Sequence, residues 1–503
     1  MKTRIKLFFA LSATALLSLT ACNNVKYAEE TDEAIIKQLE VVNREDGVYG
    51  NIYLPTEIEG ATVTWKSSNK KVIDAKGNDE MAPGIVHRQG QDTTVKLTAV
   101  IDKNGEKTQY EQEVNVKAAA PEIADEDYQA YLFGHFVGES YGKTENGQKI
   151  ATGEQMFFAL ADVGEGLKFK DMNDSTMNNL KPVLSSNVGE RGVRDPFMCR
   201  SPEGDTFYLI ATDLSVYTRG GWGNNNGTNK FTITGSHSIT LWESHDLVNW
   251  TDARLIEVAA PDAGMAWAPE MIYSEETGEY LIFFSSTIIK DKAIHERDCI
   301  YYTTTRDFVH FGETKKFIKN QPYPDGEEDP KKAQDSPVAI NNNERKIIDA
   351  SVMKIGDWYY SACKDGDNHE DGGILIQKTQ DLFDIDSWEK VMDLDDLGLK
   401  VDGNRVANNN CLEGPEWFYL NQADRTNPNT PEIGLMADLY ADTSKGYIPF
   451  ATTNVEDPTT DSWRLLTRNT DFSWDSQTKR HGTILRITEE EANRLKEAYP
   501  IAK

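Results

Sequence analysis

Short apolar and aromatic runs, separated by polar turns, fill most of the chain after residue 126. Typical runs are residues 206–212 (TFYLIAT), 279–285 (EYLIFFS) and 358–363 (WYYSAC), each preceded by Gly or Asp. Their length and their content of aromatic and β-branched residues predict short antiparallel strands. The fold class predicted for this region is therefore all-β.

Polar residues recur at a regular distance along these runs, each at the start of an apolar stretch. They are Asp195, Glu270, Asp349, Glu413 and His481, separated by 75, 79, 64 and 68 residues. Aromatic residues that close polar turns form a second series in phase with the first, namely Phe169, Trp250, Phe311, Trp388 and Trp463. A period of this size predicts a repeated unit, and four short strands per unit predict the blades of a β-propeller.

The order of the two series predicts how the ring closes. Phe169 precedes the first polar residue of its series, and no aromatic residue of the second series follows His481. Residues 131–169 would therefore supply three strands of a blade, and residues 481–487 would supply its innermost strand from the other end of the chain. Closure of this kind leaves no open sheet edge. We predict a five-bladed β-propeller with one composite blade.

A smaller all-β unit precedes this region. Residues 48–55, 61–69, 71–74, 94–101 and 110–116 alternate polar and apolar positions between turn residues. This pattern predicts a β-sandwich, and the stretch around Trp65 resembles bacterial immunoglobulin-like domains. It has no cluster of acidic or aromatic residues, which favours a spacer over a glycan-binding role. The predicted organisation is 1–22 signal peptide, 23–32 tether, 33–117 immunoglobulin-like β-sandwich, 118–125 linker and 126–503 propeller.

The first 22 residues have the pattern of a targeting segment. Lys2, Arg4 and Lys6 are followed by an apolar stretch at 7–19 and by Leu-Thr-Ala-Cys ending at Cys22. This pattern predicts a secretory signal, and the apolar stretch is too short for a membrane-spanning helix. The cysteine resembles that of the bacterial lipobox. We therefore expect lipidation at Cys22 and an exported lipoprotein of the outer membrane, on its periplasmic or its cell-surface face.

Charge and cysteine content exclude several classes of function. The chain has 53 basic and 82 acidic residues, a formal charge of −29, which argues against nucleic acid and anionic lipid surfaces as partners. Four further cysteines lie far apart without a C-x-x-C pair, which disfavours a zinc site and predicts buried free thiols. They are Cys199, Cys299, Cys363 and Cys411.

Two long polar stretches, 218–230 and 320–343, predict loops over one face of the propeller, where loops commonly shape a pocket. Trp222 in the first stretch is either a wall of that pocket or an anchor of the loop, and the sequence leaves both readings open. Residues 489–498 predict a short amphipathic helix.

Five motifs occur in a fixed order, R-D-P-F, W-A-P-E-M, I-I-D-A-S-V, L-E-G-P-E-W and R-H-G. In this order they resemble glycoside hydrolase family 43, the five-bladed propeller enzymes that include α-L-arabinofuranosidases, β-xylosidases and arabinanases. The resemblance covers the chain from about Glu126 to its C-terminus. It implies that Asp195 is the general base, that Asp349 orients the acid and tunes its pKa, and that Glu413 is the general acid.

The same resemblance implies residues that bind substrate. Trp267 in W-A-P looks like part of the second-blade binding site of the family, although many members carry Asp where this chain has Glu270. His481 in R-H-G resembles a histidine near the propeller axis, often close to calcium, so a Ca²⁺ site at His481 is expected. Arg194, beside Asp195, is a further expected substrate contact. No other cofactor is expected.

These roles imply an inverting mechanism, in which the base and the acid lie about 6.5 to 9.5 Å apart. The predicted function is the exo-hydrolysis of terminal α-L-arabinofuranosyl residues of polysaccharides or oligosaccharides. A β-xylosidase or another furanosidase of the same family is an open alternative. A non-catalytic surface glycan-binding lipoprotein is a second alternative, but the presence of all three acids favours the enzyme.

Overall fold

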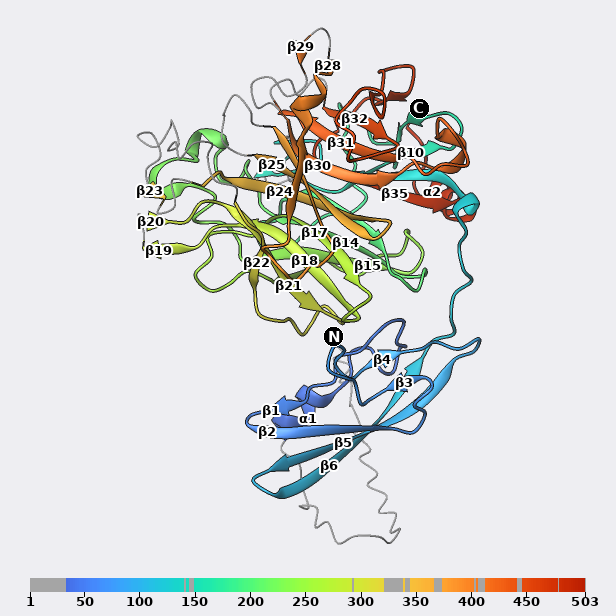
Figure 1. Ribbon diagram of the computed structural model, residues 1–503, viewed down its shortest axis with the longest axis vertical. Coiled ribbons are helices and arrows are strands. Elements are labelled where there is room, and N and C mark those ends of the chain that lie inside the picture. The colour runs from blue at the N-terminus through green and yellow to red at the C-terminus, as the bar shows by residue number, and fades with distance from the viewer. Residues whose placement is uncertain are drawn as a thin grey trace, which may run out of the picture.

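The computed structural model describes residues 33–139, 149–291, 294–320, 344–365, 373–401, 412–440, 446–477 and 479–502, together with the backbone of 142–143, 338–339 and 404–405. Figure 1 shows a small N-terminal domain, in blue, below a larger C-terminal domain. The predicted signal peptide and tether, with Cys22, lie outside the described residues, as do Cys411 and most of the predicted loop 320–343. No helix in the described part of the chain is long and apolar enough to cross a membrane.

In the described part of the C-terminal domain, five four-stranded antiparallel sheets form the main structure. Sheet I is β13 (Val193–Arg200), β14 (Phe207–Asp213), β15 (Ser238–Ser244) and β16 (Arg254–Glu257). Sheet II is β17 (Trp267–Ser274), β18 (Glu279–Ser286), β21 (Cys299–Thr305) and β22 (Lys315–Ile318). Sheet III is β24 (Ile347–Ile355), β25 (Trp358–Asp365), β26 (Ile374–Thr379) and β27 (Glu389–Asp393). Sheet IV is β30 (Leu412–Tyr419), β31 (Ile433–Leu439), β32 (Tyr447–Thr452) and β33 (Trp463–Leu465).

Sheet V joins the two ends of this domain. It consists of β12 (Lys170–Asp171), β10 (Phe157–Asp162), β7 (Tyr128–His135) and β35 (Gly482–Thr488), in that spatial order. β35 pairs antiparallel with β7 from Gly482 opposite His135 to Ile487 opposite Ala130. This pairing confirms the prediction that a C-terminal strand completes a sheet begun by N-terminal strands.

The five sheets follow one another around a ring. One strand of each sheet, which we call its innermost strand, lies against those of the neighbouring sheets. These strands follow in the order β13, β17, β24, β30 and β35, and β35 contacts β13 again. Buried apolar clusters fill the spaces between sheets I, II and III, between III and IV, between IV and V, and between V and I. Because aromatic and branched side chains alternate between the two faces of each strand, every sheet packs against both of its neighbours.

Smaller elements connect the sheets. The short strands are β8 (Gly142–Lys143), β9 (Lys149–Ile150), β11 (Leu167–Lys168), β19 (Ile289–Asp291), β20 (Ile294–His295), β23 (Val338–Ala339), β28 (Lys400–Val401), β29 (Asn404–Arg405) and β34 (Phe472–Ser473). The 3₁₀ turns include η1 (Asp125–Asp127), η2 (Trp222–Asn224), η3 (Gly227–Asn229), η5 (Leu394–Leu397) and η6 (Gln422–Asp424). Helix α2 (Glu489–Ala498) has the predicted bounds, and a reciprocal Thr488–Glu491 capping box begins it.

The N-terminal domain contains a four-stranded sheet, β1 (Glu57–Ile58), β2 (Ala61–Ser67), β5 (Thr93–Lys103) and β6 (Glu106–Val116). The pair β3 (Ile73–Asp74) and β4 (Ile85–Val86) and the helix α1 (Glu33–Leu39), which the sequence did not predict, share its apolar core. The prediction of a strand at 48–55 is wrong. This segment hydrogen-bonds within the N-terminal domain through the backbone of Val48 and Ile52, and the Asn51 side chain reaches the C-terminal domain.

The two domains are docked against each other, and the spacer role stays a prediction. Arg88 forms an ion pair with Asp205 at 2.6 Å, and its side chain is only 4% exposed. The ring of Tyr49 stacks on His245 with a centroid distance of 3.9 Å. From the other side, Arg306 donates to the carbonyl oxygen of Pro83 at 2.7 Å. We call this boundary the domain seam.

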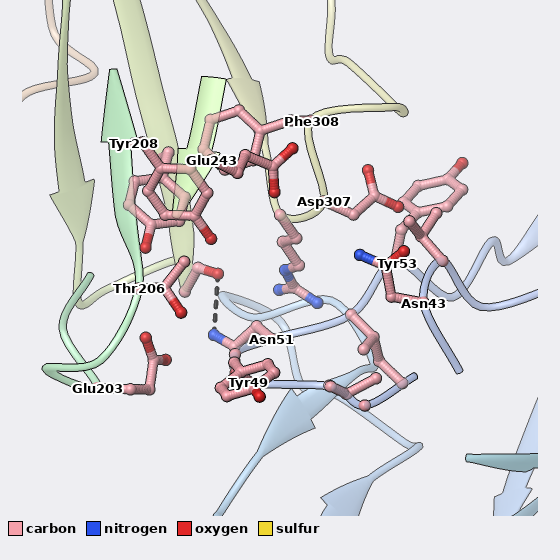
Figure 2. A pocket seen from close by; sticks show the side chains of 18 of the residues that line it. Asn43, Tyr49, Asn51, Tyr53, Glu203, Thr206, Tyr208, Glu243, Asp307 and Phe308 are labelled. Carbon is pink, nitrogen blue, oxygen red and sulfur yellow. Dashed lines mark hydrogen bonds between the residues drawn. The ribbon is translucent and has the colours of Figure 1, made fainter. Parts of the chain in front are cut away.

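A cavity of about 350 Å³ lies within the domain seam. Figure 2 shows Tyr49, Asn51 and Tyr53 of the N-terminal domain facing Glu203 and Tyr208 of sheet I across this space. The Asn51 side-chain amide crosses it to donate to the Tyr273 hydroxyl at 2.9 Å and to the carbonyl oxygen of Gly278 at 3.0 Å. Polar contacts on both sides of the cavity therefore fix the relative position of the domains.

Three of the predicted free thiols are described. Cys299 and Cys363 are buried and Cys199 is partly buried, and none of the three forms a disulfide. Burial raises the pKa of the Cys299 thiol to about 12, so the thiol stays neutral and unreactive. The prediction of free thiols in the strands is confirmed for these three residues.

We expect Asp205→Ala to lower the free energy of unfolding by about 2 to 3 kcal/mol, because the buried Arg88 cation would lose its counter-ion at the domain seam. Urea denaturation measures this loss. Glu111→Ala serves as the control, since its pair with Lys96 is exposed and should contribute less than about 1 kcal/mol. Equal effects of the two substitutions would contradict a seam stabilised by Arg88 and Asp205.

Candidate active site

Four innermost strands begin with the same backbone irregularity. Asp195, Ala268, Asp349 and Gly414 all have left-handed backbone conformations, with φ between +45° and +53°. At each of them the pairing with the next strand shifts register, as in a β-bulge. A left-handed conformation is strained for residues other than Gly and concentrates at functional sites. The ring therefore presents four equivalent, strained positions at one end of its axis.

This register corrects two of the positions inferred from sequence spacing. The residue equivalent to Asp195 in sheet II is Ala268, so Glu270 lies two residues deeper in β17. In sheet IV the strained position belongs to Gly414, and Glu413 precedes it by one residue. The spacing found the right strands and was wrong by one or two residues within them.

Hydroxyl groups of one sheet hold the strained positions of the next. The Thr212 hydroxyl donates to Asp195 Oδ2 at 3.0 Å and accepts the Ala268 backbone N–H at 2.7 Å. Ser285 accepts the Asp349 backbone N–H at 2.8 Å in the same manner. Both hydroxyls sit on second strands, β14 and β18, so neighbouring sheets fix each other's site residues.

Asp195 is paired with His481, the residue directly before β35. The His481 Nδ1 atom lies 3.5 Å from Asp195 Oδ1. Burial alone would raise the pKa of Asp195, but His481, Arg194 and the Thr212 hydroxyl hold it below its ordinary value. Burial opposes charging of His481, yet Asp195 and the nearby acids raise the pKa of the imidazole to about 9. At neutral pH the pair is therefore a carboxylate and an imidazolium.

Asp349 occupies a different electrostatic setting. Its Oδ2 atom accepts the backbone N–H of Gly414 at 3.3 Å, which ties β24 to the start of β30. Burial raises the pKa of Asp349 to about 6; His481 and Lys364 oppose this, while Glu413 and Asp195 add to it. The pKa values of the two aspartates are thus shifted in opposite directions. Asp195 is favoured in its ionised form and Asp349 in its protonated form.

Glu413 lies between two cations. Lys364, on the second strand of sheet III, donates to Glu413 Oε2 at 2.6 Å. Arg480 approaches Glu413 Oε1 at 3.5 Å and is itself held by Asp438 at 2.6 Å. Both acids of sheet IV are mostly buried, so the pairing offsets the cost of removing them from water. The carboxyl group of Glu413 is fixed in position from both sides.

Gly414 is required by the packing of the site. A Cβ atom at this position would lie 2.4 Å from His481 Cγ, and the backbone φ is +53°. The buried Tyr447 hydroxyl donates to the Gly414 carbonyl oxygen at 2.6 Å and accepts the Gly482 backbone N–H at 3.0 Å. The E-G-P and R-H-G motifs are therefore in contact, which explains why a glycine follows the glutamate.

Glu270 lies below the site, on the axis. It is 3% exposed and hydrogen-bonds to Glu416, which in turn accepts from the Thr483 hydroxyl at 2.8 Å. Burial and the neighbouring carboxylate raise the pKa of Glu270 well above its ordinary value, and burial raises that of Glu416 to about 7. Like charges at such contact cannot both ionise, so the pair holds a proton. This position favours a structural role over the expected substrate contact.

The other two expected substrate contacts lie at the edge of the site. Arg194 is buried, and its NH1 group donates to Glu139 at 2.8 Å and to Glu154 at 3.0 Å. Trp267 is partly buried at the start of β17, beside the buried Leu214, Val216 and Phe231. The structure therefore brings Asp195, Asp349, Glu413 and His481 together and places Arg194 and Trp267 around them.

The residues around His481 do not fit a Ca²⁺ ion. Among the described residues there is no group of three or more His, Cys, Asp and Glu side chains that could hold a metal ion. An imidazolium cannot ligate a cation, and the Asp195 pairing keeps His481 charged. Calcium stays a prediction from the sequence resemblance.

Residues 126–493 match the family described as a probable glycosyl hydrolase domain, related to glycoside hydrolase family 43. The chain belongs to this family. Residues 29–119 match an atrophied bacterial immunoglobulin domain, which agrees with the N-terminal domain seen here. The family-43 resemblance of the motifs and the immunoglobulin-like resemblance of the Trp65 region are both confirmed.

One curated relative is an α-L-arabinofuranosidase from Bifidobacterium longum subsp. longum, 30% identical over 437 residues. The match covers 79% of this chain but only 36% of the relative, so the chain spans about a third of that protein's length. A thermostable family-43 glycoside hydrolase aligns at 16% identity and a TM-score of 0.37, over 59% of this chain and 81% of its own. An α-L-arabinofuranosidase from Lactobacillus brevis aligns at 16% identity and a TM-score of 0.33, over 58% of this chain and 75% of its own. These structural likenesses are too distant to assign a sugar.

Sequence motifs missed three groups of this glycosyl hydrolase site. Lys364 follows Cys363 in a strand whose sequence predicts a buried core segment. Only the packing of sheet III against sheet IV brings its ammonium group to Glu413. Tyr447 and Thr212 are equally inconspicuous in sequence. All three lie outside the innermost strands, where no motif marks them, so long-range pairing is the only signal that could have found them.

The His481 pair predicts a dependence of stability on pH. The folded-state pKa of about 9 exceeds the ordinary 6.5, so the charged imidazole contributes its full stabilisation below pH 6.5 and loses it as the pH rises through 9. The shift corresponds to about 3 kcal/mol. Urea unfolding at pH 6.5 and 9.5 should show this loss in the wild type and a much smaller one in His481→Gln. The same loss in both proteins would contradict the pair.

Proposed function

We propose that this protein is an inverting exo-glycosidase that hydrolyses terminal α-L-arabinofuranosyl residues of polysaccharides or oligosaccharides. The observation that supports it is the convergence of Asp195, Asp349 and Glu413 in three contrasting electrostatic settings, in a chain of the family-43-related group. The five sheets would be the blades of a five-bladed propeller, with the reacting sugar over the end of its axis.

Asp195 would be the general base. It is held ionised by His481 and Thr212, so it can take a proton from a water molecule without first losing one of its own. Its fixed orientation would place that water on the face of the sugar opposite the leaving group, which inverts the anomeric centre. The imidazolium would keep Asp195 ionised until the proton arrives.

Glu413 would be the general acid. Its Oε2 atom is held at 2.6 Å by Lys364, whereas Arg480 is 3.5 Å from Oε1. The more weakly held Oε1 is therefore the oxygen from which the proton would pass to the leaving glycosidic oxygen. Asp349 would act through Glu413, because its bond to the Gly414 backbone sets the position at which β30 begins. Lys364 would be a positioning residue of the acid.

The choice of sugar follows the Bifidobacterium relative. A β-xylosidase or another furanosidase would use the same three acids, because the acids act on the glycosidic bond and not on the sugar hydroxyls. The predicted lipid anchor at Cys22 would hold the enzyme at the outer membrane, with substrate reaching it from the periplasm or the cell exterior.

Turnover of two aryl glycosides tests the enzyme and its sugar together. We expect the wild type to hydrolyse 4-nitrophenyl α-L-arabinofuranoside faster than 4-nitrophenyl β-D-xylopyranoside, with proton NMR showing an inverted product. Asp195→Asn should lower kcat by about 10²- to 10⁴-fold, because the amide cannot accept the proton of the attacking water. Glu111→Gln, on the N-terminal domain, is the matched control. A wild type inactive on both substrates would contradict these two sugars and leave the glycan-binding alternative.

The acid role predicts a dependence on the leaving group. Glu413→Ala should nearly abolish turnover of an arabino-oligosaccharide, whose leaving alkoxide needs a proton, and should affect the 4-nitrophenyl substrate far less. The ratio of the two losses is the measurement. Equal losses on both substrates would remove Glu413 from the role of proton donor.

A further inference from the structure

One buried hydroxyl group lies between the strand that carries Glu413 and the strand that His481 precedes. It belongs to Tyr447, the fully buried first residue of β32 in sheet IV. The hydroxyl donates to the Gly414 carbonyl oxygen at 2.6 Å and accepts the Gly482 backbone N–H at 3.0 Å. The Gly482 carbonyl oxygen, at 3.4 Å, is the more distant acceptor for its proton. The residues directly after Glu413 and His481 are thus joined through a single oxygen atom.

The β-bulge at the start of β30 gives this bond its importance. β30 pairs with β31 at Glu413 and again from Glu416, so the register shift lies at the residues between them. The extra residue of a bulge is left outside the regular pairing, and a buried carbonyl group without a partner costs free energy. The Tyr447 hydroxyl is the partner of the Gly414 carbonyl group, and Asp349 Oδ2 accepts the Gly414 N–H at 3.3 Å. Gly414 is therefore held at both of its polar groups.

The phenol ring that carries this hydroxyl is fixed on several sides. It packs edge to face on Phe133 of β7, with the ring centroids 5.8 Å apart and the planes at 66°. Its centroid lies 6.4 Å from that of the His481 ring. Trp474 Nε1 donates to the Tyr447 carbonyl oxygen at 3.1 Å. Burial raises the pKa of Tyr447 well above its ordinary value, so the hydroxyl keeps the proton that it donates.

Both joined residues lie beside groups of the proposed reaction. Glu413 directly precedes Gly414. His481 directly precedes Gly482, and its Nδ1 atom lies 3.5 Å from Asp195 Oδ1. An inverting glycosidase needs a fixed separation of its two carboxyl groups, because a water molecule must fit between the base and the sugar. Loss of the shared hydroxyl would therefore allow the acid to move relative to the base.

We infer that Tyr447 is a positioning residue that sets the separation of Asp195 and Glu413, an inference that rests on the proposed function. It acts through the backbone next to Glu413 and His481 and not on the sugar. Lys364 fixes the carboxylate of Glu413, whereas Tyr447 fixes the backbone behind it. The acid is thus held from two independent directions.

A second buried tyrosine offers a matched control. Tyr131 of β7 is also fully buried. Its hydroxyl donates to Asp424 Oδ2 at 2.9 Å and accepts the Asn421 backbone N–H at 2.7 Å. Asn421 follows the end of β30, at the opposite end of this strand from Glu413. Each hydroxyl therefore has one acceptor and one backbone N–H as partners, but only that of Tyr447 lies next to the acids.

Steady-state kinetics of Tyr447→Phe and Tyr131→Phe test the inference. We expect Tyr447→Phe to lower kcat for an arabino-oligosaccharide about tenfold and to keep KM within about twofold of the wild type, because a misplaced acid slows bond cleavage more than it weakens binding. Tyr131→Phe should leave both constants near those of the wild type. Urea unfolding measures the stability lost in each variant, and both are assayed where they are fully folded. Unchanged kcat in Tyr447→Phe, the same loss of kcat in Tyr131→Phe, or an effect on KM alone would each overturn the inference.

Crystal structures of the full chain separate this inference from the proposed function. In Tyr447→Phe the distance between the carboxyl groups of Asp195 and Glu413 should differ from that of the wild type by about 0.5 Å or more, the tolerance of a catalytic geometry. Tyr131→Phe should keep the wild-type distance. The expected change in a protein without turnover would support the link through Tyr447 and contradict the proposed hydrolysis. The same distance in all three proteins would overturn the inference, whether or not the wild type is active.

Discussion

The burial of many charges at one end of a narrow axis is the constraint on which the C-terminal domain depends. Carboxylates can remain there only if each meets a cation, a hydrogen-bond donor or a shared proton. Asp195 forms an ion pair with His481, Glu413 forms one with Lys364, and Glu270 shares a proton with Glu416. Each partner comes from a different sheet. The electrostatic balance that gives the site its chemistry therefore also selects the arrangement of the ring.

The backbone at the start of the innermost strands gives the acids different positions. Asp195 and Asp349 occupy the strained position itself, whereas Gly414 occupies it in sheet IV and displaces Glu413 by one residue. The Glu413 side chain consequently extends toward the second strand of sheet III and accepts a hydrogen bond from Lys364. A single-residue offset within otherwise equivalent strands thus distinguishes Glu413, the proposed proton donor, from the two aspartates.

Much of the fold was readable from sequence because it depends on local patterns. Aromatic strands, the composite sheet and helix α2 follow from alternation, turn residues and the order of two residue series. The same reasoning failed where contacts between distant parts of the chain determine the structure. Residues 48–55 alternate like a strand, but Val48 forms an isolated bridge to Val116 and the segment continues without regular pairing. Strand pairing likewise places Glu270 two residues deeper in β17 than Ala268, which the spacing did not predict. Lys364 could not be found because its role exists only between two sheets.

Sheet V has a consequence for how the protein comes into being. β7 and β10 leave the ribosome early, but the inner neighbour of β7 is β35, almost at the C-terminus. His481, which holds Asp195 ionised, arrives with it. A nascent or truncated chain would carry an unpaired inner edge and an unbalanced carboxylate, so neither the ring nor its electrostatics could mature in stages. Closure of the ring and the electrostatic balance of the site would therefore arise together, once β35 has been synthesised.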